Sequence, residues 1–226
     1  MRVLNEPAES GTVAPIRVVL LPAAYATLED FRKEGFVKAA RERALPLDLV
    51  FVELTLQHLT DRSILGRLRH EVVLPARASG CRSIWLGGIS LGGFVALAYA
   101  ERYPEEIDGL CVLAPYLGNH IVTGEIQRAN GVAEWTPGQL ADDDDERRIW
   151  RFIKERRAWP APLHLGFGRE DRFADSHQLM AAALTPESVD TVPGKHEWPA
   201  WRHLWENFLD RRVAPLATSI TSQASF

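Results

Sequence analysis

The sequence predicts an α/β protein with three layers, in which a mostly parallel sheet of about six strands lies between two layers of helices. Short apolar runs alternate with helical patterns along most of the 226 residues. The runs are strand-sized and rich in β-branched and aliphatic residues, as in strands that are buried on both faces. The length suits one sizeable core, so residues 15–213 are expected to form a single domain.

The strands are predicted from apolar runs that are bounded by turn residues. The six predicted strands are Ile16–Leu21, Leu47–Glu53, Arg82–Leu86, Ile107–Leu113, Pro162–Phe167 and Ser188–Val192. Functional groups in such a sheet gather where the strands reach their carboxyl ends. Residues that directly follow the strands are therefore the first candidates for a site.

The helices are predicted from apolar residues that recur at helical spacing. They are expected at about residues 28–43, 63–78, 91–102, 125–129, 145–157, 175–184 and 198–212. Thr27 suits an N-cap, because Glu29 and Asp30 follow it in the first turn. Pro75 is expected to bend or divide the second helix.

The two ends of the chain lie outside this alternation. Residues 1–14 are interpreted as a mobile leader, because Glu6, Pro7 and Glu9 stand where a signal peptide would need an apolar run. The tail, residues 214–226, is polar enough to be either disordered or a packed extension. No window approaches the 18 or so apolar residues that span a bilayer, and a cytoplasmic location is expected.

The alternation also breaks between the fourth and fifth predicted strands, over residues 116–160. This stretch is longer than an ordinary connection and is expected to form a small helical cap, with His120 at its start as a candidate substrate contact. The acidic run 142–145 lacks the glycine turn and the ligand spacing of a calcium loop. It is interpreted as the solvated N-terminus of a helix.

The composition of the chain argues against some classes of binding partner. A formal net charge of -4 at pH 7 argues against an electrostatic grip on nucleic acid or on an anionic membrane, so a small molecule is the expected partner. Cys81 and Cys111 lie in apolar segments and are interpreted as buried, reduced thiols. The sequence contains no metal-ligand cluster and no phosphate-binding glycine loop, so no cofactor is expected. The pattern leaves the oligomeric state open.

The stretch Gly88-Ile89-Ser90-Leu91-Gly92 fits the pattern G-x-S-x-G between a predicted strand and a predicted helix. Glycines on either side of the serine allow a turn so sharp that the hydroxyl stands exposed in a strained backbone. This context predicts that Ser90 is a nucleophile. The alternative is a glycine-rich turn in which Ser90 only caps the following helix.

A serine nucleophile needs a base, which is usually a histidine that a carboxylate holds in place. Asp171 follows the fifth predicted strand and His196 follows the sixth, so both are expected at the same edge of the sheet as Ser90. Glu170 and Asp175 flank Asp171; Glu170 is expected to face solvent and Asp175 to cap the next helix. Among the other histidines, only His120 is a candidate for contact with substrate, and the rest are expected to be solvated or packed.

On these residues the chain resembles the α/β-hydrolases, and in particular a compact serine esterase or lipase-like member. The resemblance rests on the serine elbow, on the loops of Asp171 and His196, and on the chain order serine, acid, base. It covers about residues 16–212. It implies the sheet order 2-1-3-4-5-6 for the predicted strands, without the first two strands of the full fold.

The resemblance also implies roles for particular residues. An oxyanion hole is expected from the N–H groups of Leu91 and of Ala24, which is favoured over Ala23, although many relatives carry His-Gly or Gly-Gly at the latter loop. Tyr25 and Trp198 are expected to line the substrate pocket. Trp201 and Trp205 recur near helical spacing with Trp198, and core packing is the alternative for all three tryptophans. The implied activity is cleavage of a carboxylic ester or thioester of a small molecule through an acyl-Ser90 intermediate. The alternatives are acyl transfer by the same triad, and a catalytically silent protein that binds ligands with this fold.

Overall fold

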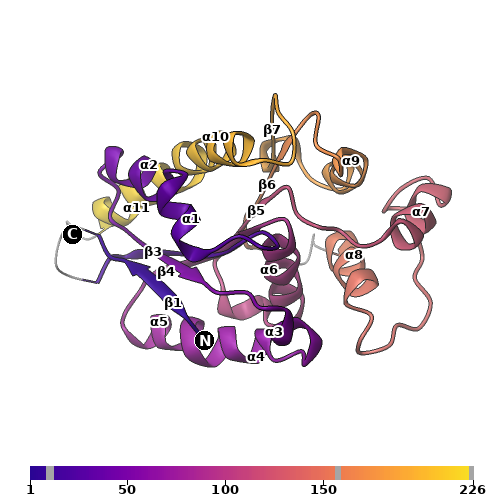
Figure 1. The fold of residues 1–226 in the computed structure, drawn as a ribbon, viewed down its shortest axis with the longest axis horizontal. Helices are drawn as coiled ribbons and strands as arrows, with labels where there is room; N and C mark the ends of the chain where they lie inside the picture. The colour runs from indigo at the N-terminus through magenta and orange to yellow at the C-terminus, as the bar shows by residue number, and fades with distance from the viewer. Residues whose placement is uncertain (9–12, 156–158, 224–226) are drawn as a thin grey trace.

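The computed structural model describes residues 1–8, 13–155 and 159–223. In this part of the chain, seven strands form one sheet (Figure 1). The strands are β1 (Val3–Glu6), β2 (Ile16–Leu21), β3 (Leu47–Val52), β4 (Ser83–Ile89), β5 (Gly109–Leu113), β6 (Leu163–Gly168) and β7 (Val189–Val192). Their spatial order is β1-β3-β2-β4-β5-β6-β7, and all neighbours are parallel except β1 and β3. Apart from β1, this is the predicted order.

The α-helices of the described chain connect these strands. They are α1 (Leu28–Lys33), α2 (Phe36–Glu42), α3 (Leu56–Thr60), α4 (Ile64–Leu68), α5 (Leu74–Ala78), α6 (Leu91–Arg102), α7 (His120–Arg128), α8 (Asp145–Glu155), α9 (Ala174–Ala182), α10 (Trp198–Phe208) and α11 (Ala214–Gln223). Thr27 lies at the N-cap of α1, where its N–H donates to the Asp30 carboxylate at 2.8 Å, as predicted for this helix start.

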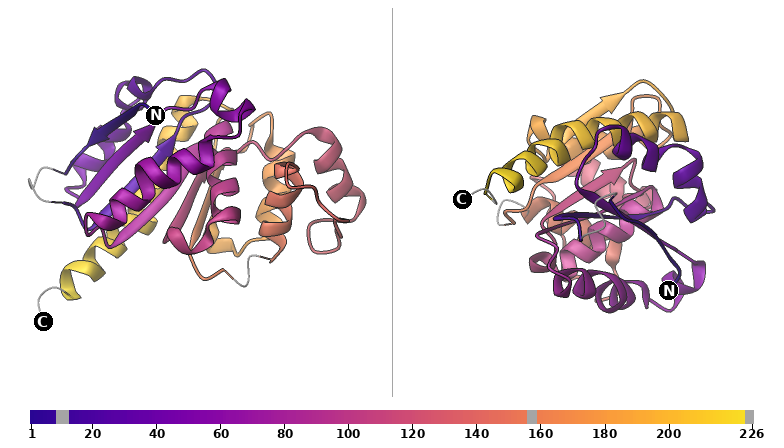
Figure 2. Two further views of the ribbon diagram at one scale, coloured as in Figure 1. Left: turned by 90° about the horizontal axis from the view of Figure 1, so that it is seen from below. Right: turned by 90° about the vertical axis from the view of Figure 1, so that its left-hand side faces the viewer.

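The helices cover the sheet on both faces, as predicted. Alternate residues of the central strands point into two apolar clusters. One cluster packs the sheet against α4, α5 and α6, and it also includes residues of α8 and α9. The other cluster packs the opposite face against α1, α2 and α10 (Figures 1 and 2). The helix that follows Ser90, α6, therefore lies in the middle of one face.

The interpretation of residues 1–14 as a mobile leader is wrong for β1. Val3–Glu6 pairs antiparallel with β3, and the Ala8 N–H donates to the buried carboxylate of Asp48 at 2.9 Å. The expectation that the first two strands of the full fold are missing is also partly wrong, because β1 adds an antiparallel strand at the edge of the sheet. The four residues of β1 are only half-buried or exposed, so their sequence lacks the apolar run that marks the central strands.

Two predicted helices are divided. The helix expected at 28–43 ends before Gly35, whose φ of +84° turns the chain between α1 and α2. The helix expected at 63–78 contains a π-helical turn, Arg69–Val73, just before Pro75. Pro75 then lies in the first turn of α5, and the predicted helix is thus divided at the π-helical turn that precedes this proline.

The last predicted helix continues beyond residue 212. A π-helical turn, Leu209–Val213, joins α10 to α11, so the tail is helical as far as Gln223 and extends away from the sheet (Figure 2). Ala217 is buried against the same apolar cluster as α10. Of the two alternatives for the tail, the packed extension is observed up to residue 223.

Residues between β5 and β6 contain α7 and α8. The indole of Trp150 on α8 is fully buried, and its N–H donates to the Leu117 carbonyl at 2.7 Å. The predicted end of this helix, at residue 157, lies outside the described residues. The start of α8 at Asp145 agrees with the interpretation of the acidic run as a helix N-terminus.

Two glycine substitutions test the packing at the elbow. A Cβ at Gly88 would lie 2.3 Å from the carbonyl carbon of Gly92, whereas a Cβ at Gly66 on α4 would meet nothing within 4 Å. We expect Gly88→Ala to lower the free energy of unfolding by about 3 kcal/mol, the upper part of the range for overpacking. Gly66→Ala should raise it by roughly 0.5–1 kcal/mol, because alanine is the better helix former. Urea denaturation of both variants measures the difference, and equal midpoints would contradict the clash.

Candidate active site

Ser90 lies between β4 and α6 in a strained conformation. Its φ is +52°, a region that residues with a Cβ rarely adopt. Added Cβ atoms at Gly88 and at Gly92 would lie 2.3 Å from the Gly92 carbonyl carbon and from the Leu21 carbonyl oxygen, respectively. Only glycine permits these approaches. The Ser90 side chain makes no hydrogen bond that caps α6, so the capping alternative is not observed.

The Ser90 hydroxyl faces a histidine. The His196 Nε2 lies 3.0 Å from Ser90 Oγ, and His196 Nδ1 lies 2.8 Å from Asp171 Oδ2. The Asp171 side chain is completely buried and the His196 side chain is 10% exposed. The structure thus brings together the three residues that the sequence singles out, although they are up to 106 positions apart.

Asp171 is held in its charged form. Burial alone would raise the pKa of Asp171, but the hydrogen bonds from His196 and from the Phe173 N–H outweigh burial and keep the pKa below its usual value. An ionised Asp171 accepts a hydrogen bond from the N–H at His196 Nδ1, which keeps the proton on that nitrogen. Nε2 is then free to accept the hydroxyl proton of Ser90, which is the arrangement that a general base requires.

The loops of Asp171 and His196 are joined to each other. The Glu170 N–H donates to the Gly194 carbonyl at 3.1 Å, and the Gly194 N–H donates to the Glu170 carboxylate. Glu170 therefore anchors the His196 loop instead of facing only solvent. Asp175 lies in the first turn of α9 and is not its N-cap, because Phe173 occupies that position. The cap prediction for Asp175 is wrong by two residues.

Aromatic rings enclose the imidazole. Phe173 and Trp201 contact the His196 ring edge to face, with ring centroids 5.1 and 5.0 Å away. The ring contacts of Trp198 are with Phe31, with Phe36 and with Trp201 at 5.2–5.8 Å, so the half-buried Trp198 packs against the core. The expectation that Trp198 lines a substrate pocket is not supported by these contacts. Trp201, one turn further along α10, is the residue beside His196.

The remaining predicted residues differ in exposure. Leu91 is the first residue of α6 and Ala24 lies in the exposed turn after β2. Tyr25 has φ +64° and is 96% exposed, and it is not among the residues that line the cavity described below. His120 is exposed at the start of α7. None of the hydrogen bonds or ring contacts found in the described chain joins His120 to Ser90, Asp171 or His196.

The turn after β5 holds the Ser90 backbone, a feature that the sequence analysis missed. The Ser90 N–H donates to the Leu113 carbonyl at 3.0 Å, and the Tyr116 N–H donates to the Ser90 carbonyl at 2.9 Å. Between them, Ala114 has φ +46°. The fully buried His177 of α9 contacts the Pro115 carbonyl of this turn through Nε2, at 2.9 Å. No motif marks this contact, because a lone histidine in a helix is usually a packing residue.

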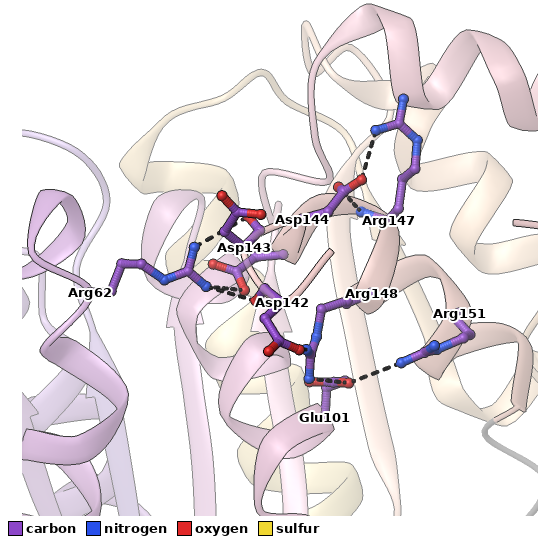
Figure 3. A network of polar contacts seen from close by, with 9 residues as sticks. Arg62, Glu101, Asp142, Asp143, Asp144, Arg147, Arg148 and Arg151 are labelled. Carbon is purple, nitrogen blue, oxygen red and sulfur yellow. Dashed lines mark hydrogen bonds and ion pairs between the residues drawn. The ribbon is translucent and has the colours of Figure 1, made fainter. Parts of the chain in front are cut away.

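A cavity of about 630 Å³ is lined by Leu91, which follows Ser90 in the chain, and by Tyr116, whose N–H donates to the Ser90 carbonyl; Ser90, Asp171 and His196 are not among its lining residues. This volume lies in the range of small-molecule sites. One side of the cavity is the outer face of α6, and the others are the α3–α4 segment and the start of α8. Figure 3 shows the charged residues on the α8 side, where Arg62 reaches across to the turn at Asp142 and Asp143.

Among residues 1–8, 13–155 and 159–223, no group of three or more His, Cys, Asp or Glu side chains could hold a metal ion. Cys81 and Cys111 are free and buried, as expected. Within the same ranges, no helix combines the length and the apolar character that crossing a membrane requires.

Comparisons with known proteins agree with this architecture. A family model described as alpha/beta hydrolase fold matches residues 71–160, which include the elbow. A search of curated proteins found no match. Among solved structures, fluorophosphonate-binding serine hydrolase F of Staphylococcus aureus is similar with a TM-score of 0.59 and 12% identity, covering 89% of this chain and 85% of that one.

Two further structures are similar over nearly their whole length. The esterase domain of a Rhodothermus marinus protein has a TM-score of 0.58 and 14% identity, covering 92% of this chain and 91% of that one. A monoacylglycerol lipase of Paleococcus ferrophilus has a TM-score of 0.52 and 17% identity, covering 96% and 99%. The chain thus has the α/β-hydrolase fold and resembles compact esterases and lipases of that superfamily.

Proposed function

We propose that this protein is a serine hydrolase that cleaves a carboxylic ester or thioester of a small molecule. One observation carries the proposal: Ser90 Oγ, His196 and the buried Asp171 form an unbroken hydrogen-bonded chain with distances of 3.0 and 2.8 Å. Structures of similar fold include an esterase domain and a monoacylglycerol lipase, and they support ester hydrolysis as the reaction class.

In the proposed reaction, Ser90 Oγ attacks the substrate carbonyl carbon while its proton passes to His196 Nε2. The charge of Asp171 stabilises the imidazolium that forms. The N–H groups of Leu91 and Ala24 are the proposed donors to the carbonyl oxygen as it gains negative charge. His196 then donates the proton to the leaving alcohol or thiol, which gives the acyl-Ser90 ester. A water molecule, activated by His196, releases the acid and restores the hydroxyl.

The nucleophile is tested by Ser90→Ala. We expect this variant to lose about 10⁴ to 10⁶ in kcat for p-nitrophenyl acetate, as in other hydrolases that lose a triad member. It should also lose covalent labelling by a fluorophosphonate. Ser79→Ala, which changes an exposed serine at the C-cap of α5, is the matched control and should label and turn over normally. A folded Ser90→Ala variant with full activity would refute the proposal.

The role of Asp171 is tested by Asp171→Asn. The amide cannot accept the Nδ1 proton in the way that a carboxylate does, so His196 adopts the wrong tautomer or orientation. We expect kcat to fall about 10⁴-fold with KM changed little. Steady-state kinetics with the same ester measure both constants. Asp175→Asn is the control at a nearby exposed carboxylate, and a loss as large in that variant would contradict the role of Asp171.

A further inference from the structure

The cavity that Leu91 and Tyr116 line is a groove along α6. Its floor consists of Leu91, Phe94, Val95, Ala98, Glu101 and Arg102, which recur every three or four residues and so share one face of the helix. At about 1.5 Å per residue, the floor is roughly 16 Å long. The end nearest the elbow is apolar, and the two charged floor residues lie at the far end.

The two walls of the groove differ in character. Leu59, Ile64 and Leu65 of the α3–α4 segment make one wall apolar, apart from Arg62 of the same segment. The opposite wall contains Asp142, Asp145, Glu146 and Arg148, from the start of α8 and the turn before it. An extended chain in the groove would therefore meet apolar atoms on its floor and on one side.

The charges of the second wall already have partners. Arg62 donates to Asp145 at 2.9 Å and so connects the two walls, and Arg148 donates to both carboxylate oxygens of Glu101 at 2.9 Å (Figure 3). Glu146 accepts from the Tyr116 hydroxyl at 2.8 Å. Burial and this hydrogen bond raise the pKa of Tyr116 to about 12, so the hydroxyl remains a donor. A charged ligand would have to compete with these bonds, whereas an uncharged one would leave them intact.

We propose that this groove binds the acyl arm of the substrate, and that the arm is a linear, uncharged alkyl chain of medium to long length. The inference rests on the proposed ester hydrolysis by Ser90. The chain would enter at Leu91, whose N–H is the proposed donor to the ester carbonyl, and would run along α6 toward Arg102. Residues 116–160, which we propose as the cap, supply the polar wall.

Ala98 lies midway along the floor of the groove, so a substitution at this residue tests whether the groove binds the acyl arm. We expect kcat/KM of the unmodified protein for p-nitrophenyl esters to rise from acetate to decanoate, by up to about fourfold per methylene. In Ala98→Phe the ring should block the groove, so that decanoate loses at least about tenfold while acetate changes less than about twofold. Ala98→Ser, which leaves the groove open, is the control. A flat chain-length profile, or unchanged decanoate turnover in Ala98→Phe, would overturn the assignment.

Binding without turnover separates this inference from the proposed function. Calorimetric titration of the Ser90→Ala variant with decanamide measures occupancy of the groove alone. We expect decanamide to bind the Ser90→Ala protein, and we expect Ala98→Phe to abolish this binding and Ala98→Ser to retain it in the same background.

If decanamide binds in this way but the unmodified protein hydrolyses no ester, the groove assignment is supported and the proposed function is refuted. If esters are hydrolysed but decanamide binding is the same in all three proteins, the groove assignment fails alone. The groove assignment would also be overturned if kcat/KM depended on the chain length of the alcohol arm of the ester but not on that of the acyl arm.

A second, independent observation concerns His177. Its side chain is fully buried, its Nε2 lies 2.9 Å from the Pro115 carbonyl, and its Nδ1 has no hydrogen-bond partner among the described residues. A carbonyl can only accept, so Nε2 carries the proton and donates it. Burial lowers the pKa of His177, which keeps the ring neutral. The histidine is thus a fixed donor to the turn after β5.

That turn controls the backbone of Ser90. Ala114 is held at φ +46°, and two residues later the Tyr116 N–H donates to the Ser90 carbonyl at 2.9 Å. His177 also lies on the helix that begins directly after Asp171. The geometry points to His177 as a positioning residue, which fixes the Ser90 elbow relative to the Asp171 loop without touching substrate.

Two amide substitutions test this role. In His177→Gln the amide nitrogen can replace Nε2 as donor to Pro115, whereas the shorter side chain in His177→Asn cannot reach it. We expect the asparagine variant to lose about 10- to 100-fold in kcat and in the rate of fluorophosphonate labelling, with KM within about twofold, because a small displacement of the nucleophile is costly. The glutamine variant should retain most of both rates. Equal rates in the two folded variants, or a change in KM alone, would overturn the role.

Discussion

Close contact between main-chain atoms at glycine residues determines where the groups of the candidate site lie. Gly88 and Gly92 bring β4, α6 and the end of β2 so close together that no Cβ fits between them. Ser90, between these glycines, is thereby held at a positive φ with its hydroxyl toward His196. Gly168 makes the second approach, against the Gly194 carbonyl, and this brings the Asp171 loop onto the His196 loop.

The interior of the site and its surroundings are stabilised by different interactions. Around His196 the neighbours are a buried carboxylate and two aromatic rings, so little water screens the hydrogen bonds there. The proposed cap combines buried apolar side chains of α8 with ion pairs at its edge, such as Arg148 with Glu101. The two side chains of this pair are only 13% and 14% exposed, so loss of either one would leave a largely buried charge without its partner.

Several differences from the sequence-based expectations have one physical origin, namely that the burial of a side chain depends on distant elements. β1 is half-buried at the sheet edge, so its four residues carry no apolar pattern. Trp198 and Trp201 lie three positions apart on α10, and only the packing of that helix decides that Trp201 faces His196. The exposure of Tyr25 depends in the same way on the turn after β2.

The sequence by itself determined the alternation of strands and helices, the order of β2 to β7 through the resemblance, and the identity of Ser90, Asp171 and His196 as residues at strand ends. These features depend on local patterns, namely apolar runs, glycine turns and chain order. Only the tertiary structure decided the edge strand β1, the groove along α6 and the contact of His177 with the turn after β5. Each of these joins segments that are distant in the chain, and such pairings depend on how the elements pack rather than on any local pattern.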